Sequence, residues 1–375
     1  MRKKVCTLSL LLAALCLTGC RGNPPQEAQE SWENLPETLS VTAEFPQNCP
    51  ETASVYQAQW YEAEEEPTVE LLMRREPTER QDLAEGPAYY CYEGETVIEN
   101  LLFKTGVSTG GLRYQDASSI PRETQSDMES LRKWDLFEES GRGMAPQTGW
   151  DRLLDYPAQE NLDFLPFGDA KAAVEQIMEA CLFPETSLSR SEVHSLERLE
   201  ENRNIYNEIC AEKDFAEGQL GELPPNAAHY WFRYEQVLDG IPLADRPWRK
   251  DDLSSVYPTS VTAQINADGL FKLDASNLCL VGDAQEEVSL LSPEEAFREY
   301  ADWYSQSLHV IDTVLAAVEL NYIFLEQGNP LTLRPAWMLF LRIEDIDPNG
   351  EKFWYSECIA VDAETGVLYG LEKKL

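Results

Sequence analysis

The second half of the chain repeats one order of local patterns, and this repetition restricts the possible folds more than any other feature. Residues 169–182 and 292–304 both have apolar residues at helical spacing. Each stretch is followed by alternating aromatic residues typical of a strand, then by two strands around a glycine turn, at 266–269 and at 362–366. We therefore expect an α+β fold of antiparallel sheets with helices packed on one face, in which one unit occurs twice.

The helices of this half have recognisable start signals. Asp169 is expected to cap the first helix, whose apolar face covers residues 173–182. Ser292-Pro293-Glu294-Glu295 combines a serine cap, a proline in the first turn and a glutamate three residues after the cap. A further, heavily charged helix is expected over 189–212. Strands are expected at 230–237, 261–265, 270–273, 318–324, 337–343 and 359–361.

The first half is less regular. Residues 104–166 are rich in Gly, Ser, Pro and charge without a sustained period, so loops with short elements are expected there. The proline-rich, polar stretch before residue 50 is typical of a flexible tether. Strands are expected at 38–45, 55–60, 89–92 and 97–103, and a short helix at 69–75. The expected divisions are the tether (20–50), an N-terminal α+β region (51–165), a first repeat (166–285) and a second repeat (286–375).

The N-terminus has the pattern of an export signal. Arg2-Lys3-Lys4 precedes an apolar run from Val5 to Leu17, which is shorter than the roughly 20 residues that span a bilayer. Residues 1–19 are therefore expected to be a cleaved signal peptide. Leu17-Thr18-Gly19-Cys20 resembles the lipobox of bacterial lipoproteins. That resemblance implies a diacylglyceryl (palmitate-type) anchor on Cys20 and a location on the extracytoplasmic face of the cell membrane, whereas an ordinary secretory signal with a chance cysteine is the alternative.

The charge of the chain restricts its partners. Asp and Glu number 67 against 30 Lys and Arg, which gives a net charge of −37. A strongly acidic protein repels phosphate backbones, so nucleic acid is not an expected partner. The hydrophobic content of 43% is too high for a disordered chain.

The cysteines indicate neither a redox motif nor a zinc site, because no C-x-x-C is present. Beyond the signal peptide and Cys20, the remaining cysteines are Cys49, Cys91, Cys181, Cys210, Cys279 and Cys358. Their separations match no disulfide framework of small scaffolds. Mostly unpaired, buried thiols are expected, with one or two disulfides left open.

Two resemblances concern the C-terminal half. The stretch from Val361 to Leu368 looks like the closing hairpin of PepSY-type domains. Residues 292–296, 319–322 and 333–337 resemble the C-terminal part of YycI/YycH-type regulators. These resemblances imply two PepSY-like repeats over 169–375 and, by family analogy, contact with a cell-wall sensor kinase. Those regulators carry an N-terminal transmembrane helix, whereas this chain has a lipobox, and residues 50–165 match no recognised family.

One motif points to an enzyme. Gly106-Val107-Ser108-Thr109-Gly110 has the G-x-S-x-G form, in which Ser108 is the nucleophile of a serine hydrolase. That motif requires a helix after the serine, whereas the residues that follow are not a helix start, so a turn between strands is the preferred interpretation. The supply of bases is small, since the histidines are His194, His229 and His309.

A second motif resembles a calcium loop. Residues Asp345 to Asn349 place oxygen ligands at alternate positions, and Gly350 is sixth. The twelfth position is Ser356 rather than a carboxylate, and the flanking segments alternate like strands. A hairpin turn without metal is expected, with calcium as the open alternative, and no cofactor is indicated.

The expected function is therefore binding rather than catalysis. We expect a lipid-anchored extracytoplasmic lipoprotein that acts as a protein-interaction or regulatory module on an unidentified partner. Modulation of an envelope sensor or of a cell-wall process is the candidate role. The alternative is a serine hydrolase that uses Ser108. Solute capture is disfavoured, because regular strand–helix alternation over two lobes is absent.

Overall fold

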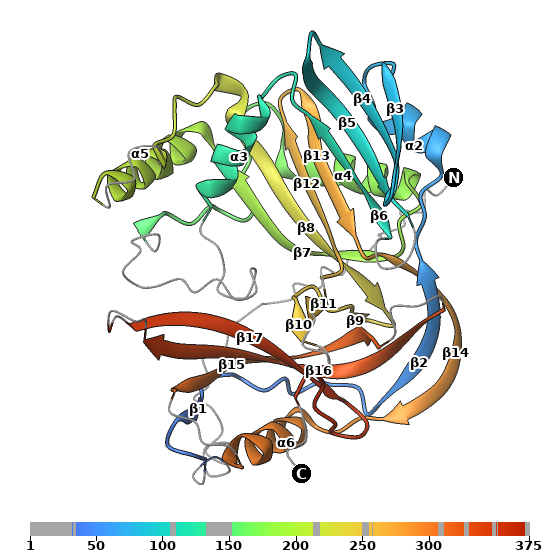
Figure 1. Ribbon diagram of the computed structural model, residues 1–375, viewed down its shortest axis with the longest axis vertical. Coiled ribbons are helices and arrows are strands. Elements are labelled where there is room, and N and C mark those ends of the chain that lie inside the picture. The colour runs from blue at the N-terminus through green and yellow to red at the C-terminus, as the bar shows by residue number, and fades with distance from the viewer. Residues whose placement is uncertain are drawn as a thin grey trace, which may run out of the picture. The chain divides into compact units, whose positions relative to one another are not determined.

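The structure is a computed structural model that describes residues 32, 35–105, 110–132, 152–212, 218–249, 255–256, 258–306, 311–325, 330–346, 350 and 352–371 (Figure 1). By its internal contacts the chain divides into the units Met1–Leu35 and Pro36–Leu375. The signal peptide, Cys20, Ser108 and His309 lie outside the described residues. The fold below is that of the unit Pro36–Leu375.

One sheet of this unit has six strands, in the order β1-β15-β16-β2-β14, with β17 also paired to β16. The strand β16 is long enough to have two partners on one edge, because residues 331–333 pair with β2 and residues 336–346 pair with β17. The pair β1–β15 is parallel, and the other pairs are antiparallel. The strands are β1 (Leu39–Val41), β2 (Thr52–Trp60), β14 (Cys279–Ser289), β15 (Thr313–Phe324), β16 (Leu331–Ile346) and β17 (Lys352–Asp362).

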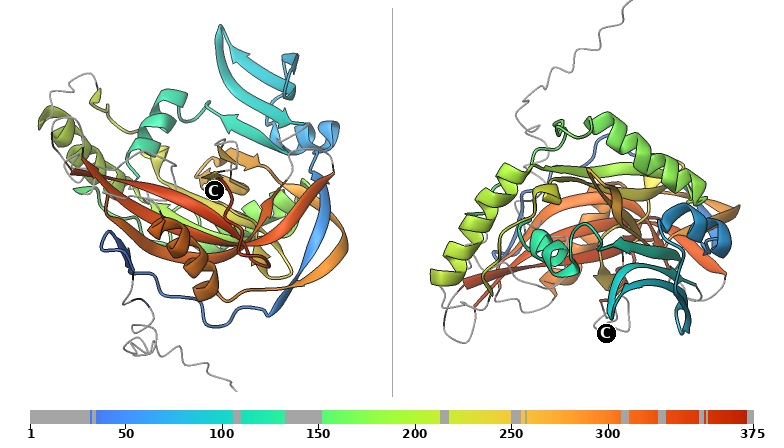
Figure 2. Two further views of the ribbon diagram at one scale, coloured as in Figure 1. Left: turned by 60° about the horizontal axis from the view of Figure 1, so that its bottom comes forward. Right: turned by 90° about the horizontal axis from the view of Figure 1, so that it is seen from above.

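The helix α6 (Pro293–Ser305) lies across this sheet and contacts β16 and β17 (Figure 2). The predicted start signal is confirmed. Ser292 Oγ accepts a hydrogen bond from the Glu295 N–H at 3.2 Å, and the Glu295 carboxylate accepts one from the Ser292 N–H at 2.8 Å. This reciprocal capping satisfies two N–H groups that the first turn leaves without helical partners.

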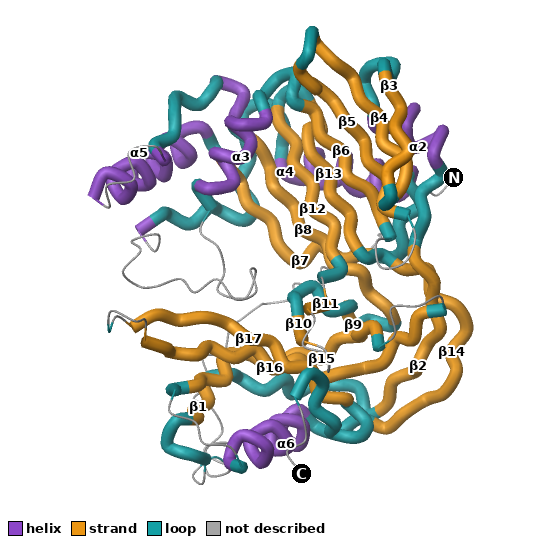
Figure 3. The backbone as a smooth tube through the Cα atoms, viewed as in Figure 1, coloured by secondary structure: helices purple, strands orange, loops and turns teal. Residues whose placement is uncertain are grey.

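The other large sheet has nine strands and is antiparallel, in the order β3-β4-β5-β6-β13-β12-β8-β7, with β9 paired to β8 (Figure 3). A separate ribbon consists of β10 (Trp248–Arg249) and β11 (Ser255–Val256). The strands are β3 (Glu79–Leu83), β4 (Gly86–Glu93), β5 (Thr96–Lys104), β6 (Gly111–Asp116), β7 (Thr186–His194), β8 (His229–Leu238), β9 (Ile241–Pro242), β12 (Ser260–Asn266) and β13 (Gly269–Ser276).

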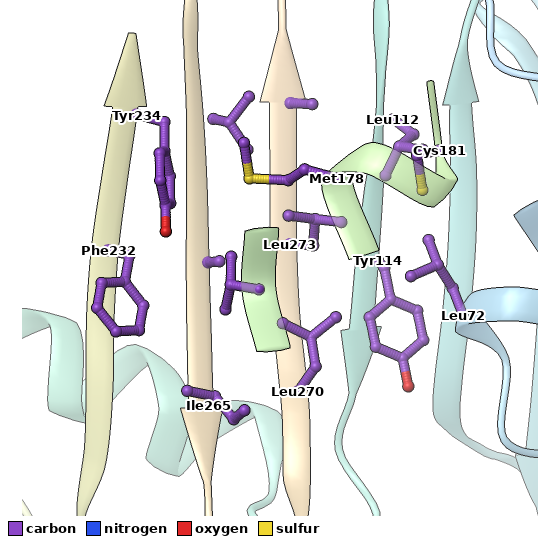
Figure 4. Close-up of a cluster of buried hydrophobic side chains, with 14 of the residues drawn as sticks. Leu72, Leu112, Tyr114, Met178, Cys181, Phe232, Tyr234, Ile265, Leu270 and Leu273 are labelled. Carbon is purple, nitrogen blue, oxygen red and sulfur yellow. The ribbon is translucent and has the colours of Figure 1, made fainter. Parts of the chain in front are cut away.

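Helices cover both faces of the nine-stranded sheet. The helices α2 (Glu65–Leu72) and α4 (Phe167–Ala180) share a buried core with Phe232, Tyr234 and Leu273 (Figure 4). The helix α3 (Arg122–Ser130) lies on the opposite face, where Glu129 contacts Lys272, the neighbour of Leu273 in β13. The helix α5 (Leu196–Glu212) joins α3 around Phe271. Burying each large apolar side chain contributes about 1.5–3 kcal/mol, so these cores hold the helices on the sheet.

The α+β class and the antiparallel sheets are confirmed, while the expectation of helices on one face holds only for the six-stranded sheet. Among the described helices, none combines the length and apolar character that a bilayer crossing requires. The predicted capping of α4 by Asp169 is wrong. The helix begins after Pro166, and Asn161 Oδ1 accepts a hydrogen bond from the Phe167 N–H at 2.9 Å instead. A side chain from the preceding loop therefore acts in place of a local cap.

The predicted helix over 189–212 is wrong in its first part. Residues up to His194 belong to β7, and α5 begins at Leu196. The charges that suggested a solvated helix face are buried in part, because Glu192 faces Arg132 and is 5% exposed. A strand whose charged residues form tertiary ion pairs can therefore be as rich in charge as a surface helix.

The predicted glycine turns are present. Gly269 has a φ of +102° between β12 and β13, which favours glycine. Gly366 has a φ of +72°, but the segment after it pairs only through the single bridge between Val361 and Leu368. Asp362 Oδ1 accepts hydrogen bonds from the N–H groups of Glu364 and Thr365, which fixes this turn.

Candidate functional site

A cavity of about 800 Å³ lies between the nine-stranded and six-stranded sheets. Residues 188–190 of β7 and the side chains of Arg233 and Glu235 in β8 line one side, and residues 318–320 of β15 line the other. Residues 240–242, 245 and 246 of the connection after β8, together with residues 46 and 48–50, complete its walls. Ligand sites in proteins have volumes of about 300–1,000 Å³, so the size of this cavity is that of a binding site.

A tight turn at the end of β8 places the connection between the sheets. Asp239 and Gly240 both have positive φ, 51° and 80°, as a two-residue hairpin of the twisted sheet requires. The returning chain pairs with β8 as β9 and then reaches the other sheet, where the Ala244 N–H donates to the Tyr322 carbonyl at 2.9 Å. Main-chain hydrogen bonds therefore connect the two sheets beside the cavity.

Three arginines and their partners line the cavity. Asp245 lies between two of them, with Oδ2 at 3.3 Å from Arg233 Nε and at 3.3 Å from Arg246 Nη1. Arg233 Nη2 also donates to the Asp245 carbonyl oxygen at 2.6 Å. Arg190 Nη2 lies 2.7 Å from Glu192 Oε1, so it joins the cavity to the buried pair beneath it. The guanidinium groups are thus held in position by carboxylates.

Carboxylates accompany these arginines in the cavity. Burial raises the pKa of Glu235, and the nearby charges of Asp245 and Glu319 raise it further. Glu235, Asp245 and Glu319 thus line the same cavity as the three arginines. The chain has a net charge of −37, whereas the cavity is lined by equal numbers of arginines and acidic residues.

The lining residues show that the cavity meets the edges of strands. Residues 188, 189 and 190 are consecutive in β7, and residues 318, 319 and 320 are consecutive in β15. The face of a strand presents only every second residue, whereas an edge presents consecutive residues. A bulge between Leu188 and Arg190 interrupts the ladder of β7 at this point. The cavity thus adjoins main-chain groups as well as side chains.

A buried polar cluster lies next to the cavity. Arg132 and His194 both bond the Glu192 carboxylate, and the ring of Tyr156 stacks on His194 at 3.8 Å. Burial raises the pKa of Glu192, but the hydrogen bonds of Arg132 and His194 outweigh it and hold that pKa well below its usual value.

Both described histidines are buried. His194 and His229 are 0% and 2% exposed, and their ring centroids are 4.3 Å apart. Burial lowers the pKa of each histidine, and in His229 the proximity of His194 lowers it further. Neither histidine reaches the cavity lining, so their role in the described structure is in packing.

The other candidate residues from the sequence are only partly visible. Asp345 lies at the end of β16, where its Oδ1 accepts a hydrogen bond from the Ile346 N–H, but 347–349 lie outside the described residues. Within the described part of the chain, no group of three metal-binding side chains occurs. All six cysteines from Cys49 to Cys358 have free thiols, and Cys49 alone among them is not buried.

The adjacent aromatic residues Trp231 and Phe232 of β8 are both buried. Phe232 and Tyr304 are 0% and 2% exposed, and Trp231 stacks under the guanidinium of Arg132 at 3.9 Å. Sequence reasoning missed the charged cluster of the cavity. One signal was present in β8, where Arg233 and Glu235 alternate with aromatic core residues and so mark the face opposite to the α4 core.

Comparisons with known proteins are consistent with the fold and give no function. No family model matches the chain, and no curated protein matches it. Among the solved structures that are similar is the crystal structure of an uncharacterized protein from Eubacterium rectale ATCC 33656, with a TM-score of 0.61 at 12% identity. The similarity covers 90% of this chain and 92% of that chain. The fold is thus shared over nearly the whole length of both proteins.

Proposed function

We propose that this protein is a lipid-anchored extracytoplasmic lipoprotein that acts by binding a protein partner. The observation that carries this proposal is the cavity between the two sheets. It combines strand edges, three arginines and three carboxylates in a volume suited to a ligand. The lipobox at Cys20 supplies the proposed location, and the anchor confines the protein near envelope partners.

The chemistry of the lining favours binding over catalysis. Ser189 Oγ donates its hydrogen bond to the Arg233 carbonyl at 3.2 Å, so no base activates that hydroxyl. Cys49 Sγ lies 3.5 Å from the Pro46 carbonyl, and burial raises the pKa of the thiol, with Glu294 adding to the effect. A thiol with a raised pKa is a poor nucleophile at neutral pH.

The regulatory role is proposed by analogy. The helix α6 is followed by the three-stranded meander β15–β16–β17, and α4 precedes a similar meander β8–β12–β13, with β7 and α5 between them. This recurrence supports the hypothesis of two PepSY-like repeats. The candidate role that follows from the YycI/YycH resemblance is modulation of an envelope sensor through protein contact.

Metabolic labelling with an alkyne analogue of palmitate tests the anchor. We expect label on the wild-type protein in the membrane fraction and its loss in Cys20→Ser, since the thioether needs the sulfur. Cys49→Ser is the matched control and should keep the label. Labelling of both cysteine variants, or an unlabelled cytosolic wild type, would refute the anchor.

Chemical cross-linking on intact cells tests partner binding. A cleavable amine-reactive cross-linker should join the wild-type protein to a specific envelope protein. The same adduct should decrease in Cys20→Ser, because the released protein loses its high local concentration at the membrane. Absence of a specific adduct from the wild type would argue against an interaction module.

A further inference from the structure

We propose that the cavity between the sheets binds an extended peptide segment that carries both acidic and basic side chains. This inference deepens the proposed function and rests on it. The main chain of the peptide would lie along a strand edge, and the charged side chains of the peptide would pair with Arg246 and Glu319 on the cavity walls. The peptide would belong to the partner protein.

The position of the cavity along β15 suits an extended peptide. The ladder between β1 and β15 ends at the pair Val41–Leu315, and the next pairing on this edge is the bridge from Leu243 to Tyr322. Residues 318–320, which line the cavity, lie between these two points. A strand edge offers N–H and C=O groups at the spacing of an added strand, which is how many domains bind extended peptides.

The edge of strand β7 bounds the opposite side of the cavity. The strand β7 is the last of its sheet, and the Val193 N–H donates to the Pro157 carbonyl at 2.7 Å, which covers the end of the strand near His194. The cavity lies at the opposite end, beside Leu188 and Ser189. A space bounded by two strand edges favours an extended chain over a compact ligand such as a folded helix.

The charges determine the class of peptide. A purely acidic ligand would meet Glu235, Asp245 and Glu319 within an acidic protein, and a purely basic one would meet three arginines. A segment with both signs can satisfy both sets, since each of its charges finds an opposite partner. Complementarity of this kind determines specificity by penalising wrong partners.

Arg246 is the most informative arginine for a test. Its side chain is 20% exposed and makes its ion pair with the adjacent Asp245 through Nη1. A guanidinium has five N–H donors in a planar fork, so it can hold Asp245 and also bind a ligand carboxylate. Arg246→Gln removes the charge, and Arg246→Glu reverses it.

A phage-displayed pool of random dodecapeptides is the probe, selected on the full-length protein purified from cells. We expect the enriched sequences to contain both Asp or Glu and Lys or Arg within an extended, proline-free stretch. A synthetic peptide of the enriched sequence should bind about tenfold more weakly to Arg246→Gln than to wild type, because one charge pair is lost. Selection on Arg246→Glu should shift the enriched sequences toward basic residues.

The control is Arg152→Glu, which makes the same change of charge in an exposed arginine paired with Glu208 and Glu212. It should leave the enriched sequences and the affinity unchanged. Thermal unfolding of each variant checks the fold, and Arg246→Gln keeps the test valid if the charge reversal does not fold. No enrichment on wild type, or equal loss in the control, would overturn the peptide proposal.

Failure of peptide binding and failure of the proposed function give different experimental results. If an envelope protein is cross-linked in cells and no peptide is enriched, the partner binds elsewhere and only the peptide inference fails. If a peptide binds and Cys20 carries no lipid, the cavity inference stands and the anchored location fails. Enrichment of sequences of one charge sign alone would also contradict the balanced-charge proposal.

Discussion

Arg132 holds both carboxylate oxygens of Glu192 in a buried pair, with Nε–Oε2 and Nη2–Oε1 distances of 2.8 Å. The two side chains are 5% and 6% exposed. Glu192 also bonds His194 Nε2 at 2.9 Å and Arg190 Nη2 at 2.7 Å. Through the contact of Glu192 with Arg190, this cluster holds a side chain that lines the cavity.

Removing one partner of this pair should destabilise the fold strongly. Arg132→Met leaves the Glu192 carboxylate buried beside one fewer positive charge, and we expect a loss of about 3–5 kcal/mol in the free energy of unfolding. Urea denaturation followed by tryptophan fluorescence measures it. Arg152→Met, in an exposed ion pair, should cost no more than about 1 kcal/mol. Equal losses in Arg132→Met and Arg152→Met would mean that burial does not determine how much the Arg132–Glu192 pair contributes to stability.

Stability should fall as the solution becomes acidic. The folded-state pKa values of His194 and His229 lie below the ordinary value of 6.5, through burial first. The unfolded chain then binds more protons than the folded one, so stability is lost as the pH falls through about 6.5. The Glu192 pKa is lowered, and its contribution is lost separately as the pH falls below about 4.5.

Denaturation midpoints at pH 7.5 and pH 5.5 measure this dependence. His229→Phe removes one of the two buried imidazoles and should make the loss between these pH values smaller. Tyr230→Phe, at the neighbouring position, removes no histidine. The loss of stability between the two pH values should therefore equal that of the wild type. A wild-type midpoint that is equal at both pH values would contradict the assignment of buried, neutral histidines.

The thiols should react at very different rates. Cys49 is partly exposed at the cavity, whereas Cys91, Cys181, Cys210, Cys279 and Cys358 are buried. Iodoacetamide labelling of the native protein, read by peptide mass spectrometry, should modify Cys49 first, although its raised pKa slows the reaction relative to a free thiol. All six should react after unfolding without a reductant. Thiols that stay unreactive in denaturant until reduced would reveal disulfides and contradict the structure.

The cap of α6 should contribute measurably to stability. Ser292→Ala removes the side-chain acceptor of the Glu295 N–H, and we expect a loss of about 1 kcal/mol in the free energy of unfolding. The serine at 289 is exposed in β14, and Ser289→Ala should change this energy by less than about 0.5 kcal/mol. Similar values for the two variants would show that the cap does not stabilise the helix.

Local patterns predicted the elements whose signals are contained within a few residues. The cap of α6 and the Gly269 turn are examples, because their chemistry involves only neighbouring positions. The expected helix over residues 189–194 is a strand instead, because the charge of Glu192 is paired with Arg132, about 60 residues away. No local pattern indicates that β2 pairs with β14, or that Asp245 pairs with Arg233. The cavity depends on such distant pairings and was therefore not predictable.

Site-specific photo-cross-linking in living cells shows directly whether the cavity between the sheets contacts a partner protein. A benzoylphenylalanine is placed at Leu320, which lines the cavity, or at Leu83, a 42% exposed residue of the edge strand β3. We expect a protein adduct from position 320, its loss when Arg246→Glu is added, and no such adduct from position 83. No adduct from position 320, or the same adduct from both positions, would show that the cavity does not bind the partner.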